Sequence, residues 1–191
     1  MLIYDIEIIK GIPAKNGSRL DGIEYCNGWN DHANMGISTI CAYDYEMDRY
    51  RVFCRDNFAA FGELAAKSKP LIGFNSLAFD DQVIRHHGLI VITEYDLLVE
   101  LWKAAGLGGK FEYPSHIGFG LDATAKANGS TGKTGSGDQA PVQWQRGEIG
   151  NVIDYCLEDV RQTKRLTDKI LRNGALNDPR FPNQKLTIRR P

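Results

Sequence analysis

Leu2-Ile-Tyr-Asp-Ile-Glu-Ile-Ile9 is the stretch of sequence that decides the fold. Its apolar, aromatic and β-branched residues predict a buried central β-strand. Two acids interrupt the run, and because residues two apart on a strand point to the same face, Asp5 and Glu7 project together. Burial of two like charges is costly unless a cation accompanies them. The stretch therefore predicts a site for hard divalent cations such as Mg²⁺, which bind carboxylate oxygens.

The Asp-x-Glu pattern has an alternative explanation when it is taken alone. The strand would then lie at the edge of a sheet, and Asp5 and Glu7 would face water. The two alternatives differ in the place of this strand in the sheet, so the rest of the chain has to separate them.

The composition is that of an ordinary globular protein. The chain has 191 residues, 42% of them hydrophobic and 25% charged, which predicts one domain with a sizeable core. No apolar run reaches the roughly 18–20 residues of a membrane span, and no secretory signal is recognised at the N-terminus. The four cysteines form no C-x-x-C pair, so we expect reduced thiols and a cytoplasmic protein. The four histidines form no H-E-x-x-H pattern, so no zinc site is expected.

Charge is distributed unevenly along the chain. The formal net charge is −1, but residues 161–191 carry nine basic and two acidic side chains. An acidic body with a basic C-terminal segment fits a nucleic-acid partner. The alternative is a solvated helix face followed by a disordered tail.

Periodicity and turn residues predict an α/β chain with a mixed sheet. Strands are expected at residues 2–9, 37–45, 50–54, 71–74 and 89–93, the second and third as a β-hairpin. Helices are expected at residues 58–67 with Asp56 as cap, 79–87, 96–105, 121–127, and from about 142 or 145 to 173, with a break near Gly147 or Gly150 and an end at Gly174. Residues 10–36 are expected to form a long loop or insertion with room for a short hairpin, and residues 128–138 a Gly-, Ser- and Thr-rich loop.

Two further carboxylate positions accompany Asp5 and Glu7. The stretch from Leu71 to Asp81 predicts a strand that turns into a helix, with Asp80 in the first helical turn. There the helix dipole favours an acid even without a metal, and Asp81 competes for the same role. In the last helix, Tyr155 and Asp159 are spaced i, i+4 and share a face that borders the apolar stripe. A phenol and a carboxylate at the rim of the core are the alternative explanation of this pair.

Together the three positions resemble the DEDDy 3′–5′ exonucleases, which belong to the DnaQ-like branch of the RNase H-like fold. The three motifs of that family are matched, in order, as D-x-E by Asp5 and Glu7, N-x-x-x-F-D by Asn75, Phe79 and Asp80, and Y-x-x-x-D by Tyr155 and Asp159. The resemblance spans residues 5–159 and implies an RNase H-like mixed five-stranded sheet flanked by helices. It divides the chain into an exonuclease domain, residues 1–176, and a basic C-terminal tail, residues 177–191.

The resemblance also implies roles for these residues. Asp5, Glu7, Asp80 and Asp159 would hold two divalent cations, Mg²⁺ or Mn²⁺, and Tyr155 would orient the attacking water. The expected substrate-binding residues are Asn75, Phe79 and Ile6. Lys133, in the Gly-rich loop, is a further expected substrate-binding residue because it could reach a phosphate; a plain linker is the alternative for this loop. Two departures stand out: Ile8 follows Asp-x-Glu where the family often has Thr, and residues 10–36 replace a short connection.

The implied activity is hydrolysis of phosphodiester bonds from a 3′ end to nucleoside 5′-monophosphates. We expect a single-stranded DNA 3′ end as substrate and no membrane partner; a replication or repair partner cannot be named from the sequence. Two alternatives stay open. One is an RNA 3′–5′ exonuclease, since no residue was found that reads the 2′-hydroxyl. The other is an inactive nucleic-acid-binding domain of the same fold.

Overall fold

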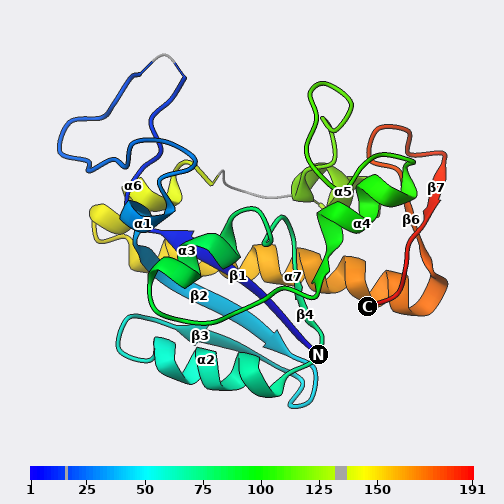
Figure 1. Cartoon of the computed structure of the whole chain (residues 1–191), viewed down its shortest axis with the longest axis horizontal. Coiled ribbons are helices and arrows are strands. Elements are labelled where there is room, and N and C mark those ends of the chain that lie inside the picture. The colour runs from blue at the N-terminus through cyan, green and yellow to red at the C-terminus, as the bar shows by residue number, and fades with distance from the viewer. Residues whose placement is uncertain (16, 132–136) are drawn as a thin grey trace.

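The structure is a computed structural model and describes residues 1–15, 17–131 and 137–191. Its main feature is a mixed five-stranded sheet in the order β3-β2-β1-β4-β5 (Figure 1). The strands are β1 (Leu2–Ile8), β2 (Ile37–Asp44), β3 (Arg49–Phe53), β4 (Leu71–Gly73) and β5 (Tyr95–Asp96). A separate two-stranded sheet pairs β6 (Ala175–Asn177) with β7 (Lys185–Thr187).

Strand β1 lies in the middle of the main sheet. It pairs along its whole length with antiparallel β2, from Leu2 opposite Asp44 to Ile8 opposite Ile37. On its other side it pairs with parallel β4 at Leu2 and Ile3 only. The predicted central strand is therefore confirmed, and the edge-strand alternative for Asp5 and Glu7 is wrong.

Seven helices accompany the sheet in the described residues. They are α1 (His32–Met35), α2 (Phe58–Lys67), α3 (Asp80–His86), α4 (Leu97–Ala104), α5 (Leu121–Ala127), α6 (Ala140–Gln145) and α7 (Ile149–Asn173). Within the described ranges, no helix combines the length and the apolar character that a membrane crossing requires.

The two faces of the sheet are covered by different helices. Tyr4 and Ile6 of β1 belong to one buried cluster with Phe61 of α2. Ile3 belongs to the other cluster, which contains Cys156 of α7. Figure 1 shows α7 behind the sheet and α3 in front of it. Because strand residues alternate between faces, Asp5 and Glu7 share the face of Ile3 and are directed toward α7.

The expected strand at residues 89–93 is wrong. This apolar run lies outside any strand, and pairing with β4 begins at Tyr95 instead. Ile90 is 86% exposed and Ile92 is 57% exposed, so two of the five residues of the run face solvent. The N–H of Thr93 donates to Asp81 rather than to a neighbouring strand. An apolar run forms a buried strand only if its backbone also has a pairing partner.

The expected helices are found to within one residue at each end, except that α6 begins at Ala140, before the expected 142 or 145; helix α1 was not expected. Gly147 separates α6 from α7, and Gly174, in the left-handed conformation at φ 65°, ends α7. The expected cap at Asp56 is wrong, because Asn57 precedes α2 and no side chain caps it. The Asn57 side chain instead accepts a hydrogen bond from the N–H of Cys54.

The insertion at residues 10–36 leaves the end of β1 and returns to it. Its one bridge joins Gly11 to Tyr25 in parallel, so the hairpin left open by the sequence does not form in the described residues. The N–H groups of Ile9 and Lys10 donate to the carbonyls of Gly36 and Met35. The insertion is thereby closed at its base, next to the end of β1 that carries Glu7.

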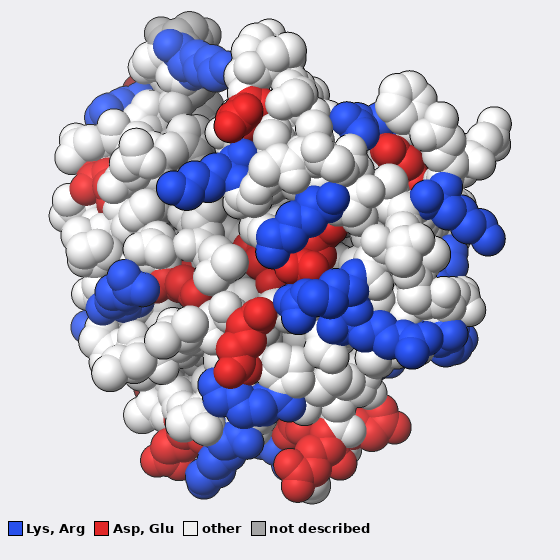
Figure 2. Space-filling model, turned by 45° about the vertical axis from the view of Figure 1, so that its right-hand side comes forward, with Lys and Arg blue, Asp and Glu red and all other residues white. Residues whose placement is uncertain are grey.

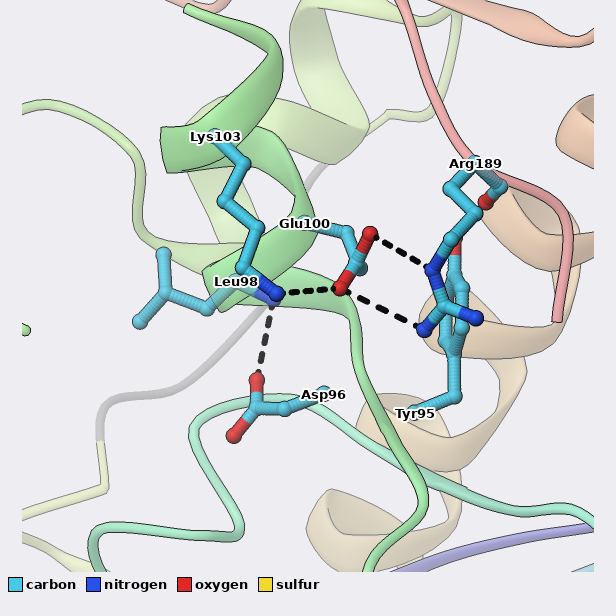
Figure 3. Close-up of polar contacts among 6 residues, drawn as sticks. All are labelled: Tyr95, Asp96, Leu98, Glu100, Lys103 and Arg189. Atoms are coloured by element: carbon cyan, nitrogen blue, oxygen red, sulfur yellow. Dashed lines mark hydrogen bonds and ion pairs between the residues drawn. The ribbon is translucent and has the colours of Figure 1, made fainter. Parts of the chain in front are cut away.

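The C-terminal segment is folded back onto α4. Leu186 of β7 and Ile188 are buried, and the Tyr95 hydroxyl donates to the carbonyl of Arg189. Arg189 also donates to both carboxylate oxygens of Glu100, to which Lys103 donates as well (Figure 3). Residues 177–191, the expected basic tail, contain the last residue of β6 and all of β7, and they pack against the rest of the protein.

Candidate metal centre

The site starts with the two acids of β1. The Asp5 side chain is half-buried and that of Glu7 is 7% exposed. One carboxylate oxygen of each and the Sγ of Cys156 all lie within 4.8 Å of one another. The central strand therefore presents two carboxylates side by side against α7, as the spacing predicts.

Cys156 is a neighbour of this pair that the sequence did not single out. Its side chain is fully buried, and its Sγ donates to the backbone carbonyl of Asp5 at 3.5 Å. Burial raises the pKa of the thiol well above its ordinary value, and Cys41, Asp5 and Glu7 raise it further. A thiol binds metals as the thiolate. Because the pKa of Cys156 is raised, we expect a neutral thiol that packs against β1 beside the two acids and is not a metal ligand. The sequence feature that could have identified Cys156 is its place beside Tyr155 in the apolar stripe of the last helix.

Asp80 contacts β1 beyond the point where β4 ends. Strand β4 is only three residues long and pairs with β1 no further than Ile3. The N–H of Ile6 therefore lacks a partner from β4, and Asp80 accepts a hydrogen bond from it at 3.1 Å. A buried backbone donor needs an acceptor, so this bond ties the start of α3 to β1 between Asp5 and Glu7.

The environment of Asp80 disfavours its ionised form. The side chain is 4% exposed. Burial raises the pKa of its carboxyl group to about 7, hydrogen bonds from its own N–H and that of Ile6 oppose the rise, and the charges of Asp81 and Asp96 add to it. A divalent cation at this position would reverse the balance, because an opposite charge favours the carboxylate.

Asp81 has a different place. Its carboxylate accepts hydrogen bonds from the Tyr4 hydroxyl and from the N–H and hydroxyl of Thr93, the latter two at 2.9 and 3.0 Å. All three donors belong to the buried interior around β1 and residue 93. Of the two neighbouring acids, Asp80 is the one that binds the backbone N–H between Asp5 and Glu7.

The turn before α3 is held by Asp96. Its carboxylate accepts from the N–H groups of Asn75, Leu77 and Leu98 at 2.9–3.1 Å, so it caps α4 and fixes the turn together. Asn75 has a φ of +66°, a left-handed conformation that Asn adopts more readily than most residues. The sequence placed Asp96 at the start of a helix but gave no sign of this second role, which depends on β4 and β5 being adjacent.

Helix α7 contributes Tyr155 and Asp159. Both lie on the turns around Cys156, whose Sγ contacts β1, and the Asp159 side chain is 7% exposed. Tyr155 is half-buried, and a Cβ built on Gly137 would lie 3.5 Å from its hydroxyl oxygen. The chain at residue 137 therefore passes close to the Tyr155 hydroxyl.

The expected substrate-binding residues fall in different places. Phe79 directly precedes α3 and contacts the rings of Trp29 and His32. Asn75 lies in the same turn and is half-buried. The Ile6 side chain is 5% exposed and packs in the core on the face opposite Asp5 and Glu7. Lys133 lies outside the described residues.

The donor set fits hard divalent cations. Glu7, Asp80 and Asp159 are each less than a tenth exposed, and Asp5 and Glu7 converge. Oxygen-rich sites of this kind suit Mg²⁺ or Mn²⁺ rather than soft metals. The raised pKa of Asp80 marks an acid whose charge the fold itself does not favour. These residues could therefore hold such a cation.

Basic side chains surround acidic ones on the surface. Figure 2 shows Asp and Glu side chains near the middle of one face, with Lys and Arg side chains around them. On α7, Arg161 and Arg165 pair with Glu158 at 3.4 and 3.7 Å. Exposed pairs of this kind contribute only about 0–1 kcal/mol, so these cations remain able to exchange to another anion.

Comparison with solved structures gives a match over most of the chain. The family B DNA polymerase from the hyperthermophilic archaeon Pyrobaculum calidifontis matches with a TM-score of 0.58 and 17% sequence identity, over 89% of this chain. The match covers 24% of the polymerase chain, so this protein corresponds to about a quarter of that length. No family model and no curated protein matches the sequence. The match supports the fold: an α/β protein with a mixed five-stranded sheet flanked by helices, consistent with an RNase H-like fold.

Proposed function

We propose that this protein is a metal-dependent 3′–5′ exonuclease that removes nucleoside 5′-monophosphates from a single-stranded DNA end. The observation that carries the proposal is the meeting of Asp5 and Glu7 with Cys156 of α7, beside an Asp80 carboxyl group that is bound to the N–H of Ile6. The likeness of the fold to part of a DNA polymerase supports a nucleic-acid substrate.

Each residue of the centre has a proposed task. Asp5, Glu7, Asp80 and Asp159 hold two divalent cations, which supply, when bound, an activated water and charge stabilisation for phosphodiester hydrolysis. The Tyr155 hydroxyl orients the attacking water. Asp96 acts as a positioning residue, since it fixes the turn that carries Asn75 and ends before Asp80.

Two features keep this centre in one geometry. Asp5 and Glu7 lie on a strand that is paired on both sides at its start, and Asp80 is tied to the same strand by the Ile6 N–H. Helix α7 has 25 residues and packs along β1 and β2. A centre built on such rigid elements needs little reorganisation when substrate arrives.

A single assay tests the activity and its polarity. A 5′-labelled single-stranded DNA incubated with Mg²⁺ or Mn²⁺ should shorten to a ladder, and excess EDTA should stop it. Shortening from the 5′ end, or a ladder that persists in EDTA, would contradict the proposal. The same strand made of RNA in a parallel reaction decides between the DNA and RNA versions. Binding of either strand without cleavage in both metals would support the inactive binding domain instead.

A further inference from the structure

Trp29 is a largely exposed aromatic residue whose ring contacts Phe79, the residue before Asp80. Its side chain is 68% exposed, and its ring lies 6.0 Å from the ring of Phe79, centroid to centroid, at an interplanar angle of 63°. His32 approaches the same Phe79 ring edge-on, also at 6.0 Å. Three rings thus meet directly beside Asp80, and one of them presents most of its surface to solvent.

The turn that carries Trp29 is held in place from within. The Asp31 carboxylate accepts from the backbone N–H and the side-chain amide of Asn27 at 2.8 and 2.9 Å, and from the amide of Asn34 at 2.7 Å. Buried Cys26 precedes the turn, and fully buried Met35 follows it. An exposed indole on a turn fixed at both ends loses little freedom when it binds, which favours a recognition role over chance exposure.

The insertion is also joined to the centre. Gln145, at the end of α6, donates to the carbonyls of Ile9 and Glu24 and accepts from the N–H of Glu24. Ile9 directly follows β1, so one side chain links the insertion to the strand of Asp5 and Glu7. The position of Trp29 relative to β1 is therefore set by hydrogen bonds at the base of the insertion as well as by Phe79.

We propose that Trp29, supported by Phe79 and His32, forms a stacking platform for an unpaired nucleobase close to the 3′ end of the strand. This inference rests on the proposed function and adds to it a base-binding residue in the insertion, outside the carboxylate centre. Aromatic faces bind bases of any sequence, because every base has a π-face. A base-paired end could not offer a free face, so the platform favours single strands over duplex ends.

Binding measured without catalysis tests this inference separately from the activity. The titration uses a fluorescent single-stranded DNA oligonucleotide in EDTA, with wild type, Trp29→Ala, Trp29→Leu, Trp29→Phe and, as a matched control, Tyr113→Ala. Tyr113 is 79% exposed on another loop. We expect Trp29→Ala and Trp29→Leu to weaken binding about 10- to 100-fold, Trp29→Phe much less, and Tyr113→Ala not at all. Equal affinity of Trp29→Ala and wild type would overturn the inference.

An abasic oligonucleotide shows whether the effect comes from stacking. If Trp29 stacks on a base, placing an abasic residue at one of the last three positions should remove the difference between wild type and Trp29→Leu, whereas an abasic residue far from the 3′ end should leave it. Stacking should also quench the fluorescence of Trp29. The change can be assigned to Trp29 because Trp102 is buried and Trp144 is half-buried. A difference that persists with every abasic position would overturn the platform, even for an active exonuclease. An inactive protein that passes these binding tests would contradict the proposed function alone.

Discussion

Two buried carboxyl groups in this molecule have pKa shifts of opposite direction. For Asp80 and for Glu100, burial is the largest influence, and it raises the pKa of both. Around Asp80 the nearby charges are those of Asp81 and Asp96, and the pKa rises to about 7. Around Glu100, hydrogen bonds from Arg189 and Lys103 outweigh burial and hold the pKa below its ordinary value (Figure 3).

The pKa shifts differ in direction because the two acids have different neighbouring groups. Glu100 receives two cationic side chains from α4 and the C-terminal segment, which suits an acid whose task is to fasten that segment. Asp80 receives a backbone N–H and two further acids nearby. Such an arrangement makes sense if a cation from solution completes it.

The largest effect is expected from Asp5→Asn. Removal of the central carboxylate should lower exonuclease activity by about 10³-fold or more, because the charge that holds the cations is lost while the side chain keeps its size. The melting temperature of the metal-free variant should equal or exceed that of wild type, since two like charges no longer meet. Asp154→Asn, an exposed acid on α7, serves as control and should keep full activity. Wild-type turnover in folded Asp5→Asn would remove Asp5 from the centre.

Tyr155→Phe should have the next largest effect. The change keeps the ring and all four carboxylates, so it removes only the hydroxyl that lies near residue 137. We expect kcat to fall about 10- to 10³-fold, within the range of groups that orient or transfer a proton. Strand affinity should barely change, because the lost interaction belongs to the transition state. Single-turnover cleavage together with a binding titration in EDTA measures the two quantities. Full activity would make Tyr155 a packing residue.

Arg189→Ala should act on stability and leave the chemistry alone. Arg189 makes two hydrogen bonds to Glu100 and lies over the Tyr95 ring at 5.2 Å. Loss of charged hydrogen bonds to a buried acid costs about 1–3 kcal/mol, and the exposure of the arginine side chain to solvent favours the lower end. At about 2–4 °C per kcal/mol, thermal melting should report a clear decrease. The kcat measured below the transition should match wild type, and a loss of activity in the folded variant would place Arg189 near the substrate.

The two acids should also give opposite pH dependences of stability in metal-free protein. A carboxyl group whose pKa is raised in the folded state binds more protons there, so its contribution falls as pH rises from about 4 to 7. Asp80→Asn should therefore gain in melting temperature relative to wild type over that range. Glu100 has a lowered pKa, so its contribution is present above about pH 4.3 and is lost as pH falls further. If the melting temperatures of Asp80→Asn and Glu100→Gln change with pH in the same way, the predicted opposite pH dependences are wrong.

The smallest effect concerns strand binding by surface cations. Arg165 and Arg189 have side chains that are both 60% exposed, but the Glu158 partner of Arg165 is 29% exposed and the Glu100 partner of Arg189 only 7%. We expect Arg165→Ala to lower the salt dependence of single-strand binding by about 0.7 in log–log slope. Arg189→Ala should leave that slope unchanged. Equal slopes in wild type and Arg165→Ala would make the basic face of α7 a solvated surface only.

Local sequence signals were sufficient for most elements and for the centre's strand. The alternation of Leu2–Ile8 and the glycines at 147 and 174 act through neighbouring residues, so the elements they define were predictable. The run at 89–93 failed because its backbone partner depends on where β4 begins: the parallel register places these residues opposite the chain before Leu71, which is not a strand. Cys156 and Asp96 were missed for a related reason: their neighbours in space are far away in sequence.

The sequence by itself determined that Asp5 and Glu7 lie on one face of a strand, and that Tyr155 and Asp159 share a face of one helix, because strand and helix periods are fixed by the backbone. The helix pattern alone left Asp80 and Asp81 as competitors, and the motif resemblance selected Asp80. The tertiary structure shows that the two acids have different partners on β1. The short β4 leaves the Ile6 N–H for Asp80, whereas Asp81 is taken up by Tyr4 and Thr93. Tertiary packing also brought Trp29 of the insertion against Phe79. The contacts of β1 with Asp80 and Asp81, and that of Trp29 with Phe79, join residues 50 to 77 positions apart, where no local pattern in the chain can specify them.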